Sequence, residues 1–393
     1  MTVPLPSRAH TRGSNRDFAA VCALFLGNGL IVGAFGGSLP GLRVRFDLTE
    51  GHIVGLLVTA AVFAVGAMNL SGPLSDRYGA RTPALVGVLL LAVSGGLMGA
   101  APDYVLLLVG VAVFGLGNGA LDVAMNALGV SVEQARGRPV MSRLHAFFSI
   151  GNLLGALVVV VLGLWLTDPD TPRWSLWTAA LLLVVLLVVG QRVVPQSPPR
   201  TPGEDDDGRR RVPAAIWLLA AMAVCFGLTE GTAVDWSSLH VTEVGGVSAS
   251  AGAWGLACVA GFMVVIRLSG DVVVAQFGRA LVVRVGAACA LVGYLLTAFV
   301  DALAPILVGW CLVGLGVGLV APQIYGLAGH IGGGRGLALV VSFGYAAFLV
   351  GPALIGFVAA RADLQRAMLV PVVTAVGLIV MSLRMPADPT DPR

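Results

Sequence analysis

Twelve apolar stretches, separated by short polar or turn-forming segments, constrain the fold of this chain more than any other feature. Each is close to the length of about 20 mainly apolar residues that an α-helix needs to cross a lipid bilayer. Only 11% of the residues are charged, whereas soluble domains carry about 25%. A soluble domain of this composition could not bury all of its apolar surface away from water. This argues against a soluble enzyme, a nucleic-acid-binding protein or a disordered chain. The stretches run over residues 18–39, 52–72, 83–101, 104–131, 140–167, 174–194, 213–241, 249–274, 280–300, 303–329, 337–360 and 367–385.

The longest polar break, at 195–213, divides the stretches into two sets of six. It is rich in proline and charge and has no apolar periodicity, so we expect a flexible linker there. The sequence therefore predicts an all-α membrane protein with twelve transmembrane helices in two pseudo-symmetric six-helix bundles. The predicted parts are an N-terminal cytoplasmic segment (1–17), the first bundle (18–194), the linker (195–213), the second bundle (214–385) and a cytoplasmic tail (386–393).

The basic residues predict the orientation of the chain, and all 24 of them are arginines. With both chain ends in the cytoplasm, nineteen arginines lie on the cytoplasmic side and five on the other, as the positive-inside rule requires. The first apolar stretch is too long for a signal-peptide core, so we expect it to be retained as a membrane helix. The Ala-, Gly-, Val- and Arg-rich composition is typical of a GC-rich bacterial genome. We therefore predict a multi-pass protein of a bacterial cytoplasmic membrane.

The two halves of the sequence resemble each other at a nearly constant offset. The glycine run GLGNG at 115–119 returns as GLGVG at 314–318, which is 199 residues later, and Asp76 matches Asp271 at an offset of 195. Parallel repeats of six helices place a substrate site between the halves, near the middle of the membrane. Rocking of one half against the other then gives each side access to that site in turn.

The segment GPLSDRYGAR, at 72–81, lies between the second and third stretches. It ends one helix at glycine and proline, and it places an acid and two cations at the membrane boundary. Such an acid can bind a helix N-terminus or an arginine, and so hold two helices in one state. The segment resembles the signature of the major facilitator superfamily, and the twelve helices and the six-plus-six repeat extend the resemblance over the whole chain. The resemblance implies a conformational latch made of Gly72, Asp76, Arg77, Gly79 and Arg81, with Asp271 in a degenerate second copy.

A second resemblance covers residues 122–151. Asp122, Asn126 four residues later, and a Phe-Ser-Ile-Gly run that ends at Gly151 are similar to the same region of fucose-permease-like proton symporters. Two features of drug:proton antiporters are missing, because Val111 stands where those proteins carry an arginine and the fifth stretch has no Gly-Pro pair. The resemblance favours proton symport, and proton-driven efflux of a drug or secondary metabolite stays open as the alternative.

Acidic residues inside apolar stretches are costly in lipid and mark functional sites by default. Asp122 lies near the middle of the fourth stretch, with Asn118 and Asn126 one turn away on the same helix face. Loss of hydration penalises a charged carboxylate, so we predict that Asp122 exchanges protons or contacts the solute. A structural acid bonded to an arginine or to the backbone is the alternative.

The seventh stretch carries Glu230 near its middle and Asp235 nearer the outside. Being five residues apart on a helix, they point about 140° away from each other, so we expect different surroundings for the two. Both are candidates for proton coupling or solute binding. Trp236 either stacks on a ring-bearing solute or anchors the helix at the membrane interface. Arg267, late in the eighth stretch, is expected to snorkel or to pair with an acid.

Other polar residues inside the stretches complete the set of candidates. Asn28, Gln323, Tyr325 and Tyr345 either face the solute pathway or form hydrogen bonds between helices. His145, near the cytoplasmic start of the fifth stretch, either relays protons or is a satisfied boundary histidine.

No cofactor and no metal site are expected. The five cysteines lie singly in apolar stretches without a CxxC pair, which is typical of buried free thiols. The absence of lysine excludes an ATP-binding loop of the Walker type. The sequence thus predicts a secondary transporter of a small organic solute that is driven by protons, embedded in lipid and monomeric, with no nucleic-acid partner and no enzymatic activity. A non-transporting membrane receptor is the remoter alternative.

Overall fold

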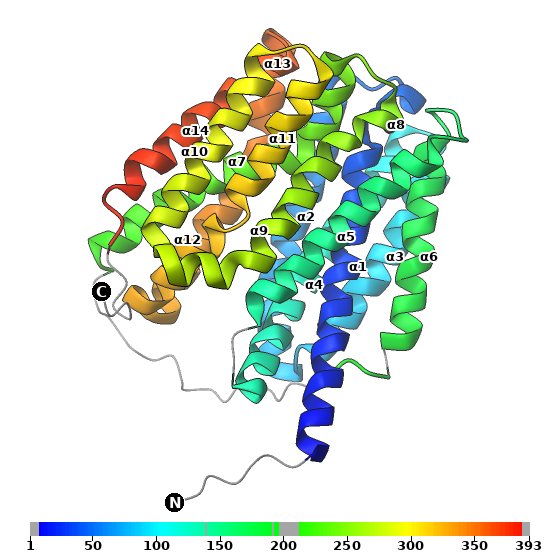
Figure 1. Ribbon diagram of the computed structural model, residues 1–393. Helices are drawn as coiled ribbons and strands as arrows, with labels where there is room; N and C mark the ends of the chain where they lie inside the picture. Colours follow the sequence, from blue (N-terminus) through cyan, green and yellow to red (C-terminus); the bar gives the residue numbers. More distant parts are fainter. Residues whose placement is uncertain (1–7, 138–139, 191, 196–211, 387–393) are drawn as a thin grey trace, which may run out of the picture.

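The computed structural model describes residues 8–137, 140–190, 192–195 and 212–386, and the regular structure in these ranges is α-helical (Figure 1). The predicted linker at 195–213 and the tail at 386–393 fall almost entirely outside the described residues, as do the first seven residues. The helices are α1 (Arg8–Phe46), α2 (Glu50–Tyr78), α3 (Arg81–Ala100), α4 (Tyr104–Arg136), α5 (Met141–Leu162), α6 (Thr171–Gly190), α7 (Ala214–Gly245), α8 (Ala249–Gly252), α9 (Trp254–Phe277), α10 (Arg279–Phe299), α11 (Leu303–Val317), α12 (Val320–Arg361), α13 (Leu364–Ala367) and α14 (Leu369–Ser382).

Twelve helical spans of the described chain are long and apolar enough to cross a membrane, which confirms the predicted number. Helices α8 and α9 together form the eighth span, Ala249–Phe277, and α13 and α14 form the twelfth, Leu364–Ser382. Helix α12 contributes to two spans, Leu303–Gly333 together with α11 and then Arg335–Arg361. These two spans meet at Gly333, whose φ of 59° is a left-handed conformation that glycine adopts without steric cost.

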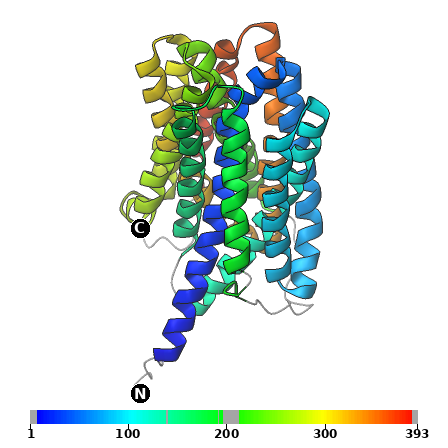
Figure 2. The ribbon, with the colours of Figure 1, turned by 90° about the vertical axis from the view of Figure 1, so that its right-hand side faces the viewer.

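The helices pack into two bundles that follow the order of the chain (Figure 1). In the first bundle α1 packs on α5, and both α2 and α3 pack on α4; in the second, α7 packs on α12, and both α9 and α10 pack on α11. The bundles meet mainly where α5 contacts α9 and where α2 contacts α12. Helix α1 begins and α14 ends toward the same end of the molecule, here termed the terminal end (Figures 1 and 2). The opposite end, where α1 ends at Phe46 and α7 at Gly245, is termed the distal end.

The internal repeat is visible in the way the helices approach one another. A Cβ atom at Gly115 of α4 would lie 2.4 Å from the carbonyl oxygen of Ala60 on α2. A Cβ atom at Gly314 of α11 would lie 2.2 Å from the carbonyl oxygen of Val259 on α9. Both residues of the second contact stand 199 positions after those of the first. The same shift relates the α3–α4 contact of Gly87 with Gly117 to the α10–α11 contact of Gly286 with Gly316. Helices α2, α3 and α4 therefore recur as α9, α10 and α11.

Helices α1 and α5 touch backbone to backbone through glycine. A Cβ atom at Gly151 would lie 2.1 Å from the carbonyl oxygen of Leu26, and one at Gly155 would lie 2.2 Å from that of Leu30. In lipid there is no hydrophobic force between helices, so small residues that allow close approach carry much of the association. This contact fixes the position of α5, which carries polar residues of the site described below.

The carboxylates of Asp103 and Glu133 cap the starts of α4 and α5, the two helices that carry the N-terminal part of that site. The carboxylate of Asp103 accepts from the backbone N–H of Leu106 over 2.9 Å at the start of α4. The carboxylate of Glu133, near the end of α4, accepts from the backbone N–H of Val140 over 2.7 Å at the start of α5. These bonds satisfy N–H groups that a helix start leaves without partners.

We expect Gly155→Ala to destabilise the fold, because the new methyl group meets the backbone of α1 and forces the two helices apart. Overpacking of this kind costs about 1–3 kcal/mol, which will appear as a lower thermal midpoint of the purified protein. Gly96→Ala is the matched control, since nothing lies within 4 Å of a Cβ atom at that position of α3. Equal midpoints for the two variants would contradict the close α1–α5 contact.

Candidate functional site

Four charged side chains of the described residues lie ten or more positions from both ends of their membrane spans. They are Asp122 on α4, Glu230 and Asp235 on α7, and Arg267 on α9. A charge in an apolar interior is costly unless it is paired and hydrogen-bonded. The partners of these four groups therefore define the candidate site.

Arg267 joins the two bundles. It is 8% exposed, and its Nη2 donates to Oε1 of Glu230 over 3.2 Å. Its Nη1 donates to Oγ of Ser149 on α5 over 2.6 Å and to the carbonyl oxygen of His145 over 3.4 Å. Its Nε donates to the carbonyl oxygen of Gly318 over 3.1 Å. One side chain of the second bundle is thus bonded to α5 of the first, and of the two roles expected for Arg267, the structure shows pairing with an acid.

Asp122 makes a second connection between the bundles. The hydroxyl of Tyr345 on α12 donates to Oδ2 of Asp122 over 2.6 Å. On α4 itself, Nδ2 of Asn126 donates to the carbonyl oxygen of Asp122 over 2.8 Å and to its Oδ1 over 3.3 Å. In the described part of the chain, no cation forms an ion pair with this carboxylate. Asp122 is therefore held by dipoles, whereas Glu230 is held by a charge.

Two tyrosines of α12 connect the acids of the two bundles. Tyr325 and Tyr345 both lie within electrostatic range of Asp122 and of Glu230. Tyr294 on α10 also lies within range of Glu230, and its hydroxyl donates to the carbonyl oxygen of Thr229, the residue before this acid. Asp122 and Glu230 therefore belong to one site, although they are 108 residues apart in sequence.

Asp235 has surroundings different from those of Glu230. Its carboxylate accepts no hydrogen bond from any described residue and is only partly exposed. It lies one turn beyond Gly231, on a face of α7 that turns toward α12, since a Cβ atom at Gly231 would lie 3.0 Å from the ring of Phe348. The next residue, Trp236, is 2% exposed, and its buried indole nitrogen has no hydrogen-bond partner among the described residues. Trp236 therefore does not anchor the helix at a lipid interface.

The remaining predicted residues lie around this centre. Asn28 on α1 is 1% exposed, and its Nδ2 lies 3.8 Å from the sulfur of Met125 on α4, while its Oδ1 has no partner in the part of the chain that the structure describes. The ring of His145 packs edge-on against Phe25, with ring centroids 5.3 Å apart. Gln323 in α12 is buried, at 6% exposure. Asn28 and Gln323 are buried within the bundles, and His145 packs against α1. The solute-contact and structural roles expected for these residues both stay predictions.

The sequence analysis missed the roles of Ser149 and Tyr294 in the site. Ser149 stands within the Phe-Ser-Ile-Gly run, so its position was marked, but its bond to Arg267 depends on how α5 meets α9. No sequence pattern pointed to Tyr294 as a site residue, because one tyrosine in an apolar stretch does not show which helix it faces.

The two bundles are also joined at the distal end. Arg43, at the end of α1, bonds to Glu50 of α2 over 2.5 Å and forms an ion pair with Glu243 of α7. The carboxylate of Asp168, before α6, accepts from the backbone N–H groups of Ala249 and Ser250 over 3.2 and 3.1 Å. These contacts are polar and partly exposed, so their breakage costs little compared with the breakage of an apolar core.

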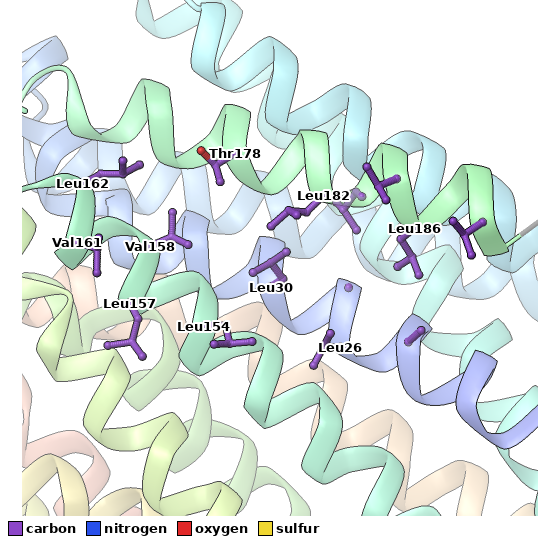
Figure 3. A pocket seen from close by; sticks show the side chains of 15 residues that line it. Leu26, Leu30, Leu154, Leu157, Val158, Val161, Leu162, Thr178, Leu182 and Leu186 are labelled. Carbon is purple, nitrogen blue, oxygen red and sulfur yellow. The ribbon is translucent and has the colours of Figure 1, made fainter. Parts of the chain in front are cut away.

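A groove of about 680 Å³, shown in Figure 3, shares no lining residue with the polar site. It runs between α1, α5 and α6, and its lining is aliphatic apart from Thr178. Such a groove matches lipid tails and has no set of polar groups for a polar solute. The candidate functional site is therefore the polar network between the bundles.

Comparison with known proteins identifies the family. The sequence model of the Major Facilitator Superfamily matches residues 21–333. An uncharacterized MFS-type transporter of Yersinia pestis is 31% identical over 371 residues, which cover 93% of this chain and 94% of the relative. The chain belongs to the Major Facilitator Superfamily. A second relative, the uncharacterized transporter y4wD of Sinorhizobium fredii, is 30% identical over 349 residues, with coverage of 88% of this chain and 92% of the relative.

A crystal structure of the Escherichia coli fucose:proton symporter FucP has the same fold. It matches 94% of this chain and 98% of its own, with a TM-score of 0.63 at 17% identity. The fold class predicted from the sequence is therefore confirmed, and the chain is a multi-pass membrane protein of a transporter family. The two relatives are transporters, in line with the expectation that the chain is not an enzyme.

The superfamily signature at 72–81 spans the end of α2. The helix continues through Gly72 and Pro73 to Tyr78, so the helix end expected at glycine and proline is wrong. Gly79 follows the helix with a φ of 82°, which favours glycine, and Gly278 follows α9 with a φ of 76°. These two glycines are 199 residues apart, in the register of the repeat. In that register Ala275 corresponds to Asp76, so the expected match of Asp271 with Asp76 is wrong by one helical turn.

The other predicted latch residues lie in the last turns of α2 and at the start of α3. The side chain of Asp76 lies outside the described part of the structure. Gly72 lies within α2, and no atom lies within 4 Å of the place that a Cβ atom would take there. The guanidinium of Arg77 lies 5.2 Å from the ring centroid of Tyr78, and Arg81 begins α3. The latch remains a prediction for these residues.

We expect Arg267→Gln to destabilise the protein more than Glu230→Gln, because it removes the donors of four hydrogen bonds, whereas Glu230→Gln weakens only one of them. Removal of one partner of a buried ion pair costs about 3–5 kcal/mol. The double variant should recover part of the loss, since no charge is then left unpaired. The measurement is the thermal midpoint of each purified variant, and equal effects for Arg267→Gln and the double variant would show that the pair is not coupled.

Proposed function

We propose that this protein is a proton-coupled secondary transporter that moves a small organic solute across a bacterial cytoplasmic membrane by alternating access. The observation that carries the proposal is the polar network between the bundles, in which Tyr345 binds Asp122 while Arg267 binds both Glu230 and Ser149. Charged side chains are costly inside a membrane, so their presence there marks a functional site by default. The contacts of this network lie where the two repeats of such a transporter meet, which is the usual position of the substrate site.

The inter-bundle contacts suit a rocking motion. At the distal end the bundles are joined by the ion pair of Arg43 with Glu243 and by the bonds of Asp168 to the start of α8. Both are small polar contacts between surfaces that each belong to one bundle. Their separation needs no rearrangement of the glycine-packed helix pairs within either bundle.

Asp122 and Glu230 are the residues that we propose for protonation, one in each bundle. Both titratable carboxylates lie inside the membrane spans and contact the opposite bundle or the residue that reaches it. Proton uptake by either group changes the charge balance of the contact between the bundles. This links the proton gradient to the rocking of the bundles.

We favour symport, because residues 122–151 resemble fucose-permease-like symporters and FucP, a neighbour in fold, is a fucose:proton symporter. Exchange of protons for an exported solute is the second candidate. It is favoured by the lack of a cationic partner at Asp122 among the described residues, since a proton and a solute can then compete for one carboxylate.

We also propose that the protein acts as a monomer with both chain ends in the cytoplasm. The arginine distribution supports this orientation. The terminal end would then be cytoplasmic and the distal contacts external. The signature residues at 72–81 would form the latch at the cytoplasmic side.

Transport is tested in proteoliposomes that contain a pH dye, challenged with a panel of sugars, organic acids, amines and antibiotics. We expect one class of solute to change the internal pH, with acidification for symport and alkalinisation for exchange. Asp122→Asn and Glu230→Gln should each reduce the rate by about tenfold or more, since each removes a bond to a charged group. Asp301→Asn, in an exposed loop, is the matched control. Unchanged rates in both Asp122→Asn and Glu230→Gln would contradict the proposed coupling.

The distal ion pair is tested with spin labels at positions 47 and 246, near the distal ends of α1 and α7. We expect Arg43→Gln to raise the ratio of long to short label distances by roughly 1.4- to fivefold, because a partly exposed ion pair is worth about 0.2–1 kcal/mol. Arg45→Gln is the control, since Arg45 bonds to the carbonyl oxygen of Ala101 within the first bundle. A distance distribution that Arg43→Gln leaves unchanged would rule out a gating role for this pair.

A further inference from the structure

The charges inside the bundle do not balance. The deep charged groups of the described chain are the three carboxylates of Asp122, Glu230 and Asp235 and the single guanidinium of Arg267. With all four ionised, the interior carries two more negative than positive charges. An uncompensated charge inside an apolar interior is costly, so this site favours a cation, either a proton or a positively charged solute.

Arg267 is not free to receive an anionic solute. Four donor contacts already occupy its guanidinium, with Glu230, Ser149, His145 and Gly318 as acceptors. An anionic solute would have to displace Glu230 and would leave a further carboxylate without a partner. Arg267, the one deep cation of the described structure, is therefore already paired with Glu230.

Asp122, by contrast, offers acceptor atoms to a donor-rich cation. Its carboxylate is bonded by one hydroxyl and one amide, both neutral. The hydroxyl oxygen of Tyr345 donates its own proton to Asp122 and keeps lone pairs that accept. The amide of Asn126 donates through Nδ2 and keeps its carbonyl oxygen as an acceptor. All three residues are only partly buried, so a solute can reach them.

We propose that Asp122, Tyr345 and Asn126 bind a protonated amine group of the transported solute. An ammonium group has three N–H donors and no acceptor. The three residues supply a carboxylate and an amide oxygen one helical turn apart on α4, and a hydroxyl oxygen on α12. This inference rests on the transport function proposed above and names the charge class of its solute.

The charged and titratable groups that the other helices bring to the site support this assignment. Helix α7 contributes Glu230, and α9 contributes Arg267, which is paired with it. Helix α12 contributes its two tyrosines, and α5 contributes His145, whose carbonyl oxygen accepts from Arg267. In the described spans of α1, α2 and α3, no charged group lies at comparable depth. No cation other than the paired Arg267 therefore competes for the carboxylate.

The test uses matched sets of probes that differ in charge, namely benzylamine, benzyl alcohol and benzoate, and glucosamine, glucose and gluconate. Binding to the purified full-length protein is measured by the rise of its thermal midpoint with probe concentration. In at least one set we expect the amine to bind about tenfold more tightly than its neutral and anionic counterparts, as a charge-assisted hydrogen bond implies. Equal or tighter binding of the neutral or anionic probe in both sets would overturn the proposal.

Variants assign the preference to Asp122. Asp122→Asn keeps the size and the acceptor for Tyr345 but removes the charge, so the amine preference should fall to less than about threefold. Asp301→Asn, the same change in an exposed loop, should leave the preference unchanged. If Asp122→Asn does not fold, Asn126→Ala decides, because loss of one acceptor beside an intact carboxylate should weaken amine binding by about threefold or more. An amine preference that survives the informative variant overturns the proposal.

The outcomes separate this inference from the transport function. A neutral or anionic solute that drives pH changes in proteoliposomes would refute the amine site and leave transport standing. Amine binding that depends on Asp122, with no solute-driven pH change and no movement of the distal labels, would refute transport and leave the site standing.

Discussion

The structure depends on one constraint, which is that polar groups in an apolar solvent must be satisfied within the protein. Twelve helical spans satisfy the backbone internally. The helices then need another basis for association, because lipid and aliphatic side chains are equally apolar. Glycines such as Gly115 and Gly155 supply it by bringing helices within backbone contact. The remaining polar side chains are few, and several of them find partners across a helix boundary, as Arg267 does with Glu230 and Ser149.

That requirement explains why the site lies between the bundles. Within each bundle the glycine contacts leave little room for water or solute. Between the bundles, contacts are made by Arg267 with Ser149, by Tyr345 with Asp122 and by Arg43 with Glu243. Close glycine contacts also occur between the bundles, as Gly163 with Ser250 and Gly356 with Val54, but these two glycines meet side chains and not backbone. A protein that has to separate its halves repeatedly needs bonds that water or a solute can replace, and polar groups meet this need.

Much of the fold and part of the site could be predicted from the sequence. The twelve spans followed from hydropathy. Asp122 and Glu230 stood out because acids are rare in apolar stretches. The match of Asp271 with Asp76 failed because an isolated acid sets no register, whereas the glycine contacts, shifted by 199 residues throughout, do. Trp236 was misread as a possible interfacial anchor because hydropathy does not show which face of a helix is covered.

The sequence by itself determined how many helices cross the membrane, where each begins and which charged residues lie deep within them. Local composition decides these properties, because each span must by itself be apolar enough for lipid and must pair its own backbone N–H and C=O groups. Only the tertiary structure decided which charges pair. Arg267 meets Glu230 and Ser149, and Asp122 meets Tyr345 but no cation in the described chain, because helices far apart in sequence pack at particular rotations. A partner 223 residues away leaves no local trace in the sequence, and the difference between a paired and an unpaired acid is a property of the packing alone.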